Sequence, residues 1–167
     1  MLNTKETSSV IDVRIFPYRF LKPTTAEKIL NKIYNLEGKV RVLIHGPSLP
    51  KKINYGPAKG LEVNHQDRKT IKVHGEDVDL RLNVGEIIIT VELKRLNDFL
   101  NQLEDILNEN MPCDYIQMIG IFTKTTATVS DYLKYGENFE NILDQRYIGM
   151  VDPSTRSSDS IKIINSN

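Results

Sequence analysis

The sequence predicts an α+β fold in which two helices cover one face of an antiparallel sheet. Several short segments alternate apolar with polar residues, which is typical of half-buried strands. Two longer segments carry apolar residues at helical spacing, and each lies between strand segments. The chain has 167 residues, enough for one domain with a stable core.

The first half of the predicted sheet contains a strand, a helix and a second strand. Residues 10–16 alternate Ile11, Val13 and Ile15 with polar side chains. The segment 24–27 is typical of a capping box in which Thr24 and Glu27 satisfy early backbone N–H groups of a helix. That helix is expected to end at Gly38, and residues 39–45 form the next strand.

The second half repeats this order after an inserted hairpin. Residues 70–84 indicate the hairpin, and Gly75 is expected at the first central position of its turn. A strand is predicted over 86–93 and another over 114–123. The helix between them carries one apolar stripe, made of Leu96, Leu100, Leu103 and Leu107. The order β-α-β, hairpin, β-α-β is the ferredoxin-like split βαβ arrangement, in which right-handed crossovers place both helices on one face.

The domain boundaries follow from these elements. Residues 1–9 are predicted to be a flexible N-terminus and 10–136 the ferredoxin-like domain, with the loop and hairpin of 46–84 inserted between its halves. Residues 137–167 are expected to be a C-terminal extension, partly disordered or docked. One cysteine, no signal peptide and no run of apolar residues long enough to span a bilayer predict a cytoplasmic protein without membrane association.

Charge is unevenly distributed along a chain whose formal net charge is zero. Residues 39–72 hold eight basic and two acidic side chains, whereas residues 86–114 hold seven acidic and two basic ones. A basic and an acidic region favour partners that bind in one orientation. The absence of an overall positive charge argues against nucleic acid as a partner.

Three kinds of catalytic or ligand site find little support in the residues. The segment Gly56–Gly60 resembles a phosphate loop only loosely, because Pro57 removes an amide and no helix follows. A triad could be written from Ser48 or Ser130 with Asp131 and a histidine, but no nucleophile elbow is present, and Ser130-Asp131 more simply begins a short helix at 129–135. The possible metal ligands lack paired spacing, so no metal site is predicted from His45, His65, His74 and Cys113.

A binding surface for another protein is the remaining candidate. The segment His45–Gly60 contains three prolines, which stiffen it and reduce the entropy lost on binding. Apolar and basic side chains alternate there, and the predicted partner-binding residues are Leu49, Lys51, Lys52, Ile53, Tyr55 and Lys59. A loop that merely folds back on its own sheet is the alternative.

Four separated segments carry a resemblance to a known family. They are IFPYRFLKPTTAEKILNKIY (15–34), RVLIHGPSLPKKINYGPAKG (41–60), VNHQDRKTIKVHGE (63–76) and TVSDYLKYG (128–136). Together they resemble methyl-coenzyme M reductase operon protein D of methanogenic archaea, over about residues 10 to 136.

The resemblance implies a function that the residues alone do not. It implies a non-enzymatic accessory protein of methanogenesis, without a cofactor of its own, that binds subunits of methyl-coenzyme M reductase and other maturation proteins. Its role would be to assist assembly, maturation or activation. Two alternatives stay open: a carrier or guard of a small ligand such as the nickel porphinoid coenzyme F430, and an RNA-binding regulator.

Overall fold

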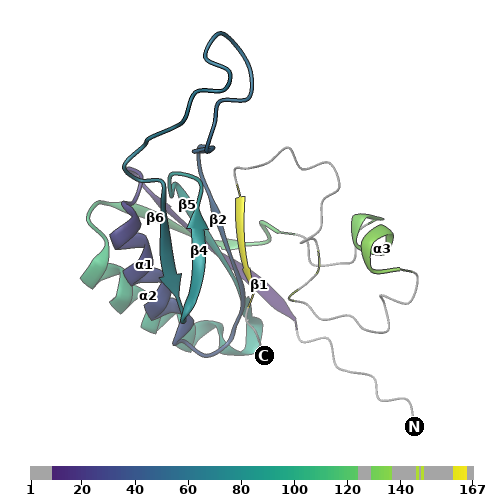
Figure 1. Ribbon diagram of the computed structural model, residues 1–167. Coiled ribbons are helices and arrows are strands. Elements are labelled where there is room, and N and C mark those ends of the chain that lie inside the picture. The colour runs from purple at the N-terminus through teal and green to yellow at the C-terminus, as the bar shows by residue number, and fades with distance from the viewer. Residues whose placement is uncertain (1–8, 124–128, 137–145, 147, 149–159, 165–167) are drawn as a thin grey trace.

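The chain folds as an antiparallel sheet with helices against one face, and the computed structural model describes residues 9–123, 129–136, 146, 148 and 160–164 (Figure 1). The strands are β1 Val10–Pro17, β2 Lys39–His45, β3 Lys69–Val73, β4 Glu76–Leu80, β5 Glu86–Glu92, β6 Tyr115–Gly120 and β7 Ser160–Ile164. The helices are α1 Pro23–Tyr34, η1 Leu93–Arg95 (a 3-10 turn), α2 Leu96–Asn110 and α3 Val129–Tyr135. The main sheet has the order β6-β1-β5-β2-β7, and β3 and β4 form a separate hairpin.

The order of the strands confirms the predicted α+β class. Strands β1 and β2 both pair antiparallel with β5, which lies between them, and β6 pairs antiparallel with β1. The two main helices and the inserted hairpin are present as predicted. A long insertion, residues 46–85, connects β2 to β5 where a short turn would suffice. The chain therefore leaves the sheet at His45 and returns to it at Glu86, at the same end.

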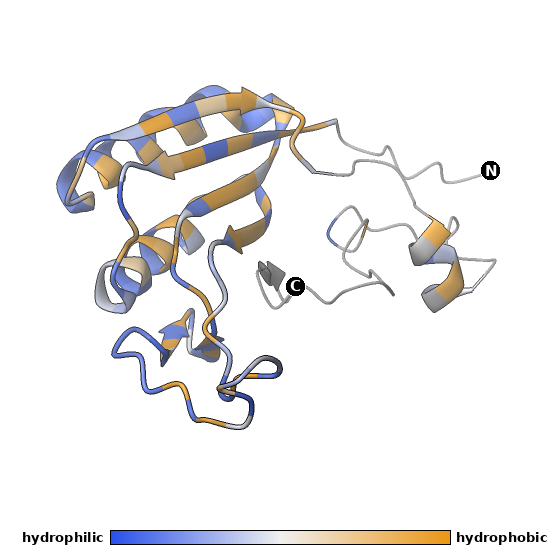
Figure 2. Ribbon diagram, turned by 90° about the horizontal axis from the view of Figure 1, so that it is seen from above, coloured by the Kyte–Doolittle hydropathy of each residue, from blue (hydrophilic) through white to orange (hydrophobic). Residues whose placement is uncertain are grey.

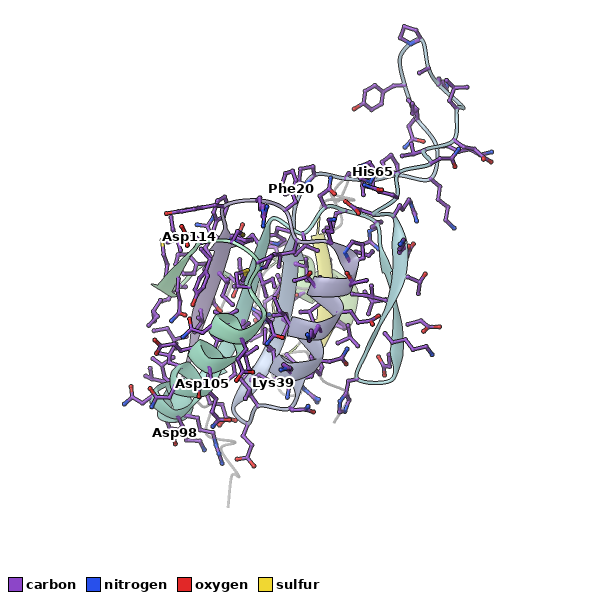
Figure 3. The ribbon with its side chains drawn as sticks, turned by 90° about the vertical axis from the view of Figure 1, so that its left-hand side faces the viewer. Phe20, Lys39, His65, Asp98, Asp105 and Asp114 are labelled. Carbon is purple, nitrogen blue, oxygen red and sulfur yellow. The ribbon has the colours of Figure 1, made fainter. Side chains whose placement is uncertain are left out.

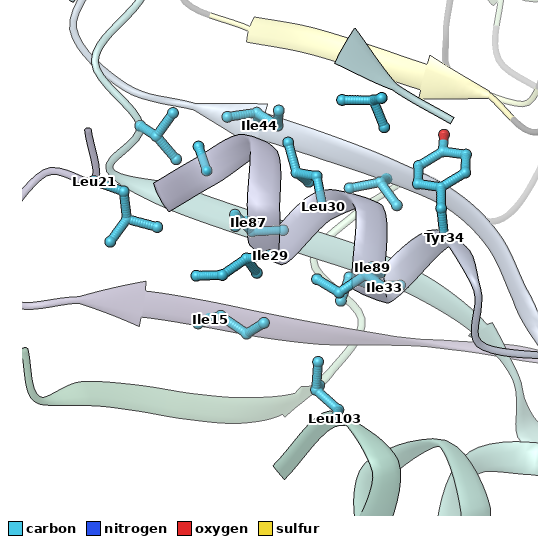
Figure 4. Close-up of a cluster of buried hydrophobic side chains, with 14 of the residues drawn as sticks. Ile15, Leu21, Ile29, Leu30, Ile33, Tyr34, Ile44, Ile87, Ile89 and Leu103 are labelled. Atoms are coloured by element: carbon cyan, nitrogen blue, oxygen red, sulfur yellow. The ribbon is translucent and has the colours of Figure 1, made fainter. Parts of the chain in front are cut away.

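The core lies between the sheet and the two main helices. Val13 and Val42 are both register partners of Ile89, so these three side chains share the face of the sheet beneath the helices. The predicted stripe on α2 faces this core, with Leu103 and Leu107 fully buried. Figure 4 shows the cluster, and Figure 2 shows apolar residues recurring along the strands and helices.

The start of α1 differs from the predicted capping box. The helix begins at Pro23, and no side chain caps it. Glu27 instead accepts a hydrogen bond from the backbone N–H of Lys72 at 2.8 Å. One turn on, Asn31 accepts from the N–H of His74 and donates to the carbonyl of Lys72, each at 2.8 Å. Glu27 and Asn31 therefore fix the edge of the β3–β4 hairpin against α1. They form hydrogen bonds with backbone N–H and carbonyl groups that a neighbouring strand would otherwise satisfy.

The turn of the β3–β4 hairpin is shifted by one position from the prediction. Its two central residues are His74 and Gly75, with φ angles of 51° and 82°. Positive φ at both positions is the geometry of a primed hairpin turn. Gly75 therefore occupies the second central position, because β3 ends at Val73.

The C-terminal part of the chain contributes to the sheet. Strand β7 pairs with β2 from His45↔Ser160 to Arg41↔Ile164 and forms a fifth strand that the sequence did not predict. The short helix expected at 129–135 is α3. Most of the expected N-terminal segment and C-terminal extension lies outside the described residues. In the part of the chain that is described, no helix combines the length and apolar character of a membrane span.

The face of the sheet opposite the main helices carries a buried polar cluster. The Asp12 carboxylate accepts hydrogen bonds from Thr90 Oγ1 at 2.7 Å, from the N–H of Phe122 at 2.9 Å, and from both the N–H and Oγ1 of Thr123 at 2.8 Å. Arg41 donates to the same two threonine hydroxyls. Burial lowers the pKa of Arg41, and the charges of Asp12 and Asp131 oppose that shift.

Tyr34 ends α1 with its hydroxyl buried. Its Oη has no hydrogen-bond partner among the residues described, and only 7% of the residue is exposed. Burial, and then the negative charge of Glu76, raises the pKa of Tyr34 to about 12. The ring lies beneath the Lys39 ammonium, whose nitrogen is 5.2 Å from the ring centroid.

Candidate protein-binding arm

The insertion between β2 and β3 projects from the end of the sheet as a hairpin-like arm (Figure 1). We call residues 51–63 the arm. Its two sides are joined by hydrogen bonds from the N–H of Ile53 to the carbonyl of Leu61 at 3.0 Å and from Val63 to Lys51 at 2.9 Å. A third bond, from Gly60 to the carbonyl of Ile53 at 2.8 Å, closes the tip. The arm therefore has an ordered backbone of its own, although it lies away from the core.

The arm joins the body through a root of two laddered segments, residues 45–49 and 81–85. The N–H groups of Leu49, Asn83 and Gly85 donate to the carbonyls of Arg81, Pro47 and His45 at 2.7, 2.9 and 2.9 Å. Gly46 is required within this ladder, because a Cβ at that position would lie 1.6 Å from the carbonyl oxygen of Asn83. The root thus fixes the direction in which the arm leaves the body.

Most of the predicted partner-binding residues lie on the surface of the arm. Tyr55 is 84% exposed, Ile53 is half-buried, and the side chains of Lys51, Lys52 and Lys59 are exposed. Leu49 is different, since it is 8% exposed and packs at the root. Leu49 therefore anchors the arm and does not present apolar surface to a partner.

The charge of the arm is positive, since residues 51–63 hold three lysines and one glutamate. Within the described residues no carboxylate lies within 4.0 Å of the ammonium groups of Lys51, Lys52 or Lys59. The acidic residues of α2, among them Asp98 and Asp105, lie at the end of the body away from the arm (Figure 3). The positive arm and these acidic side chains of α2 therefore lie at opposite ends of the body (Figure 3).

The residues weighed as ligands or catalysts do not converge. His45 Nδ1 lies 3.9 Å from a carboxylate oxygen of Glu86, His65 Nδ1 accepts a hydrogen bond from the N–H of Asp67, and His74 is in the hairpin turn. Asp131 is fully buried in α3. Across the described ranges, no three His, Cys, Asp or Glu side chains form a group that could hold a metal ion.

Apolar surface in and beside the arm was not predicted from the sequence. Leu61 is 61% exposed opposite Ile53. Phe16 near the end of β1 is 41% exposed, and Tyr18 and Phe20 on the segment that connects β1 to α1 are 64% and 54% exposed. Their recurrence at every second residue around Pro17 was a signal, because side chains at every second residue of an extended backbone point to the same side.

Comparison with known proteins decides the family. A family model described as methyl-coenzyme M reductase operon protein D matches residues 12–160. The chain belongs to this family. The resemblance carried by the four sequence segments is thereby confirmed.

Relatives within the methyl-coenzyme M reductase operon protein D family match over nearly their whole length. The "Methyl-coenzyme M reductase II operon protein D" of Methanothermobacter thermautotrophicus is 57% identical, with 90% of this chain and 93% of the relative covered. The protein of the same description from Methanothermus fervidus is 52% identical, covering 95% and 97%. The "Methyl-coenzyme M reductase operon protein D" of Methanosarcina barkeri is 33% identical, covering 96% and 90%.

Proposed function

We propose that the chain is a non-catalytic accessory protein that binds methyl-coenzyme M reductase through the arm and assists its assembly, maturation or activation. The single observation that carries the proposal is the arm itself. It presents an 84%-exposed tyrosine and three exposed lysines on an ordered backbone, outside the core. Membership of a family described by the reductase operon supports the reductase as the partner.

The physical case for binding rests on low ordering cost and on an aromatic anchor. Because the arm is already closed by its own hydrogen bonds, little backbone entropy is lost when a partner covers it. Tyr55 supplies a large contact area, and the apolar groups of Ile53 and Leu61 lie near it on the two paired sides. The lysines contribute mainly to association rate and to salt dependence.

The experiment measures binding of the purified chain to methyl-coenzyme M reductase from a methanogen by biolayer interferometry. Tyr55→Ala should weaken binding roughly 30-fold, the equivalent of about 2 kcal/mol for an anchor at an interface centre. The double variant Lys51→Glu with Lys52→Glu should weaken binding most at low salt and less at high salt. Mass spectrometry of partners that co-purify with the tagged chain identifies the subunit contacted.

Leu93→Ala is the matched control, since Leu93 is also an exposed apolar residue, 49% accessible, at the opposite end of β5. It should bind the reductase like the wild type. All variants should keep the wild-type melting temperature, because exposed side chains contribute little to the core. Normal binding by both arm variants would show that the arm is not the interface.

A further inference from the structure

A depression of about 400 Å³ lies at the root of the arm, and we call it the root pocket. Its walls come from three places in the chain: Phe16, Tyr18 and Phe20 at and after the end of β1, Gly46 and Pro47 at the start of the insertion, and Gly85 before β5. Figure 3 shows Phe20 at the edge of the body from which the arm leaves. The root pocket is therefore built by segments that are distant in sequence.

The pocket is apolar and open. Its three aromatic residues are each between 41% and 64% exposed, so together they leave a contiguous apolar surface in contact with water. Exposed apolar patches of this kind mark interaction sites on proteins that otherwise bury such side chains. Gly85 shapes the floor, because a Cβ there would lie 3.3 Å from the ring of Phe20.

The rim of the pocket is electropositive. Glu86 forms an ion pair with Arg14 and also lies 3.9 Å from His45 Nδ1. Arg19 donates to the carbonyl oxygen of Pro112 at 2.7 Å, and no carboxylate within the described residues lies within 4.0 Å of its guanidinium. Arg14 and Glu86 neutralise one another, and Arg19 adds one positive charge at the rim, so the rim favours negative charge.

The position of the pocket at the root of the arm favours a protein segment as its occupant. A protein segment covers the rim as well as the walls. Gly46 and Pro47 line the pocket and also begin the insertion, so a protein that holds the arm is brought to the pocket.

We infer that the root pocket receives an aromatic or large aliphatic side chain, flanked by acidic residues, from a segment of the partner protein. The apolar side chain would lie against Phe16, Tyr18 and Phe20, and a flanking carboxylate would lie near Arg19. The inference rests on the proposed function for the identity of the partner, the reductase, but the chemistry of the pocket can be tested without it.

The first experiment titrates the ¹⁵N-labelled full chain with three capped pentapeptides and follows backbone amide shifts by NMR. The probes are Asp-Asp-Phe-Asp-Asp, the same peptide with alanine in place of phenylalanine, and the same peptide with lysine in place of aspartate. The acidic phenylalanine peptide should give saturable shifts at Tyr18, Phe20, Gly46 and Gly85. The other two should bind at least about ten-fold more weakly, because each lacks one of the two complementary features.

Phe20→Ala tests the site within the same titration, with Leu93→Ala as the control. Phe20 is 54% exposed, so its truncation should leave the melting temperature close to that of the wild type. Phe20→Ala should abolish the shifts at Gly46 and Gly85, whereas Leu93→Ala should keep them. Equal shifts from all three peptides, shifts located elsewhere, or unchanged binding by Phe20→Ala would overturn the inference.

The second experiment measures binding of Phe20→Ala and Tyr55→Ala to the reductase. Both should bind at least about ten-fold more weakly than the wild type. Weakening by Tyr55→Ala with normal binding by Phe20→Ala would overturn the pocket and leave the proposed function standing. If the wild-type chain does not bind the reductase at all, the proposed function fails, and the peptide titration alone decides whether the pocket binds an acidic aromatic segment.

Discussion

Replacing Asp12 by alanine should destabilise the fold more than any change on the arm. Asp12 is 1% exposed, and its carboxylate accepts four hydrogen bonds, from two threonine hydroxyls and two backbone N–H groups. It also supplies negative charge beside Arg41, which is 3% exposed. Asp12→Ala therefore removes an acceptor from four donors and leaves a buried guanidinium with less compensation.

The magnitude follows from these contacts. A hydrogen bond to a charged acceptor contributes about 1.5–3 kcal/mol, but the four bonds are not additive, because two of the donors belong to Thr123 and can relax together. Removing one partner of a buried charged pair costs about 3–5 kcal/mol. We expect a loss of about 3–5 kcal/mol in the free energy of unfolding, which corresponds to a fall in melting temperature of about 6–20 °C for a chain of this size.

Urea unfolding followed by circular dichroism measures the free energy for the wild type, Asp12→Ala and the control Asp105→Ala. Asp105 is an exposed acidic residue on α2, so its replacement should change stability by no more than about 0.5 kcal/mol. If Asp12→Ala were as stable as Asp105→Ala, the carboxylate would not hold the segment at Phe122 and Thr123 against the sheet. The reasoning about the buried cluster would then be wrong.

Two further predictions concern the core beneath the helices. Leu103 is fully buried, so Leu103→Ala should destabilise the fold by about 2–5 kcal/mol through lost transfer energy and a cavity. The control Asn101→Ala, on the exposed side of α2, should be nearly neutral. Equal losses of unfolding free energy for the two variants in urea would contradict the orientation of the helix. Tyr34→Phe removes a buried hydroxyl that has no hydrogen-bond partner in the described residues, so stability near neutral pH should stay the same or rise by up to about 1 kcal/mol. Because the pKa of Tyr34 is about 12 in the fold and 10.0 ordinarily, the unfolded chain releases this proton first, and stability is lost as the pH rises between those values. Urea unfolding across that range should show a steeper loss for the wild type than for Tyr34→Phe, by up to about 2–3 kcal/mol, and parallel losses would show that the hydroxyl titrates as if exposed.

Local sequence patterns predicted most of the helices and strands, because such patterns depend only on the spacing of residues within one segment. The alternation in 10–16 and 39–45 and the stripe at Leu96–Leu107 correspond to β1, β2 and α2 in the structure. Periodicity reports which face of an element is apolar, and that face is buried wherever a core is available.

The features that the sequence did not predict depend on contacts between distant segments. Glu27 has the sequence context of a capping residue, yet it bonds to Lys72, since the hairpin lies beside α1. Leu49 is an apolar residue in a loop, and only the ladder with 81–85 buries it. The root pocket likewise requires the ends of β1 and β2 and the start of β5 to lie at the same edge, which no single segment encodes.

The laddered root sets how the two proposed contacts act together. Since residues 45–49 are hydrogen-bonded to 81–85, the arm and the pocket are separated by a short, ordered stretch of backbone and not by a flexible tether. A partner held at one contact therefore meets the other at a high effective concentration, so two weak contacts yield one tight complex without any additional interface. The same geometry makes the complex selective, because a protein that offers both binding elements at another spacing can engage only one of them at a time.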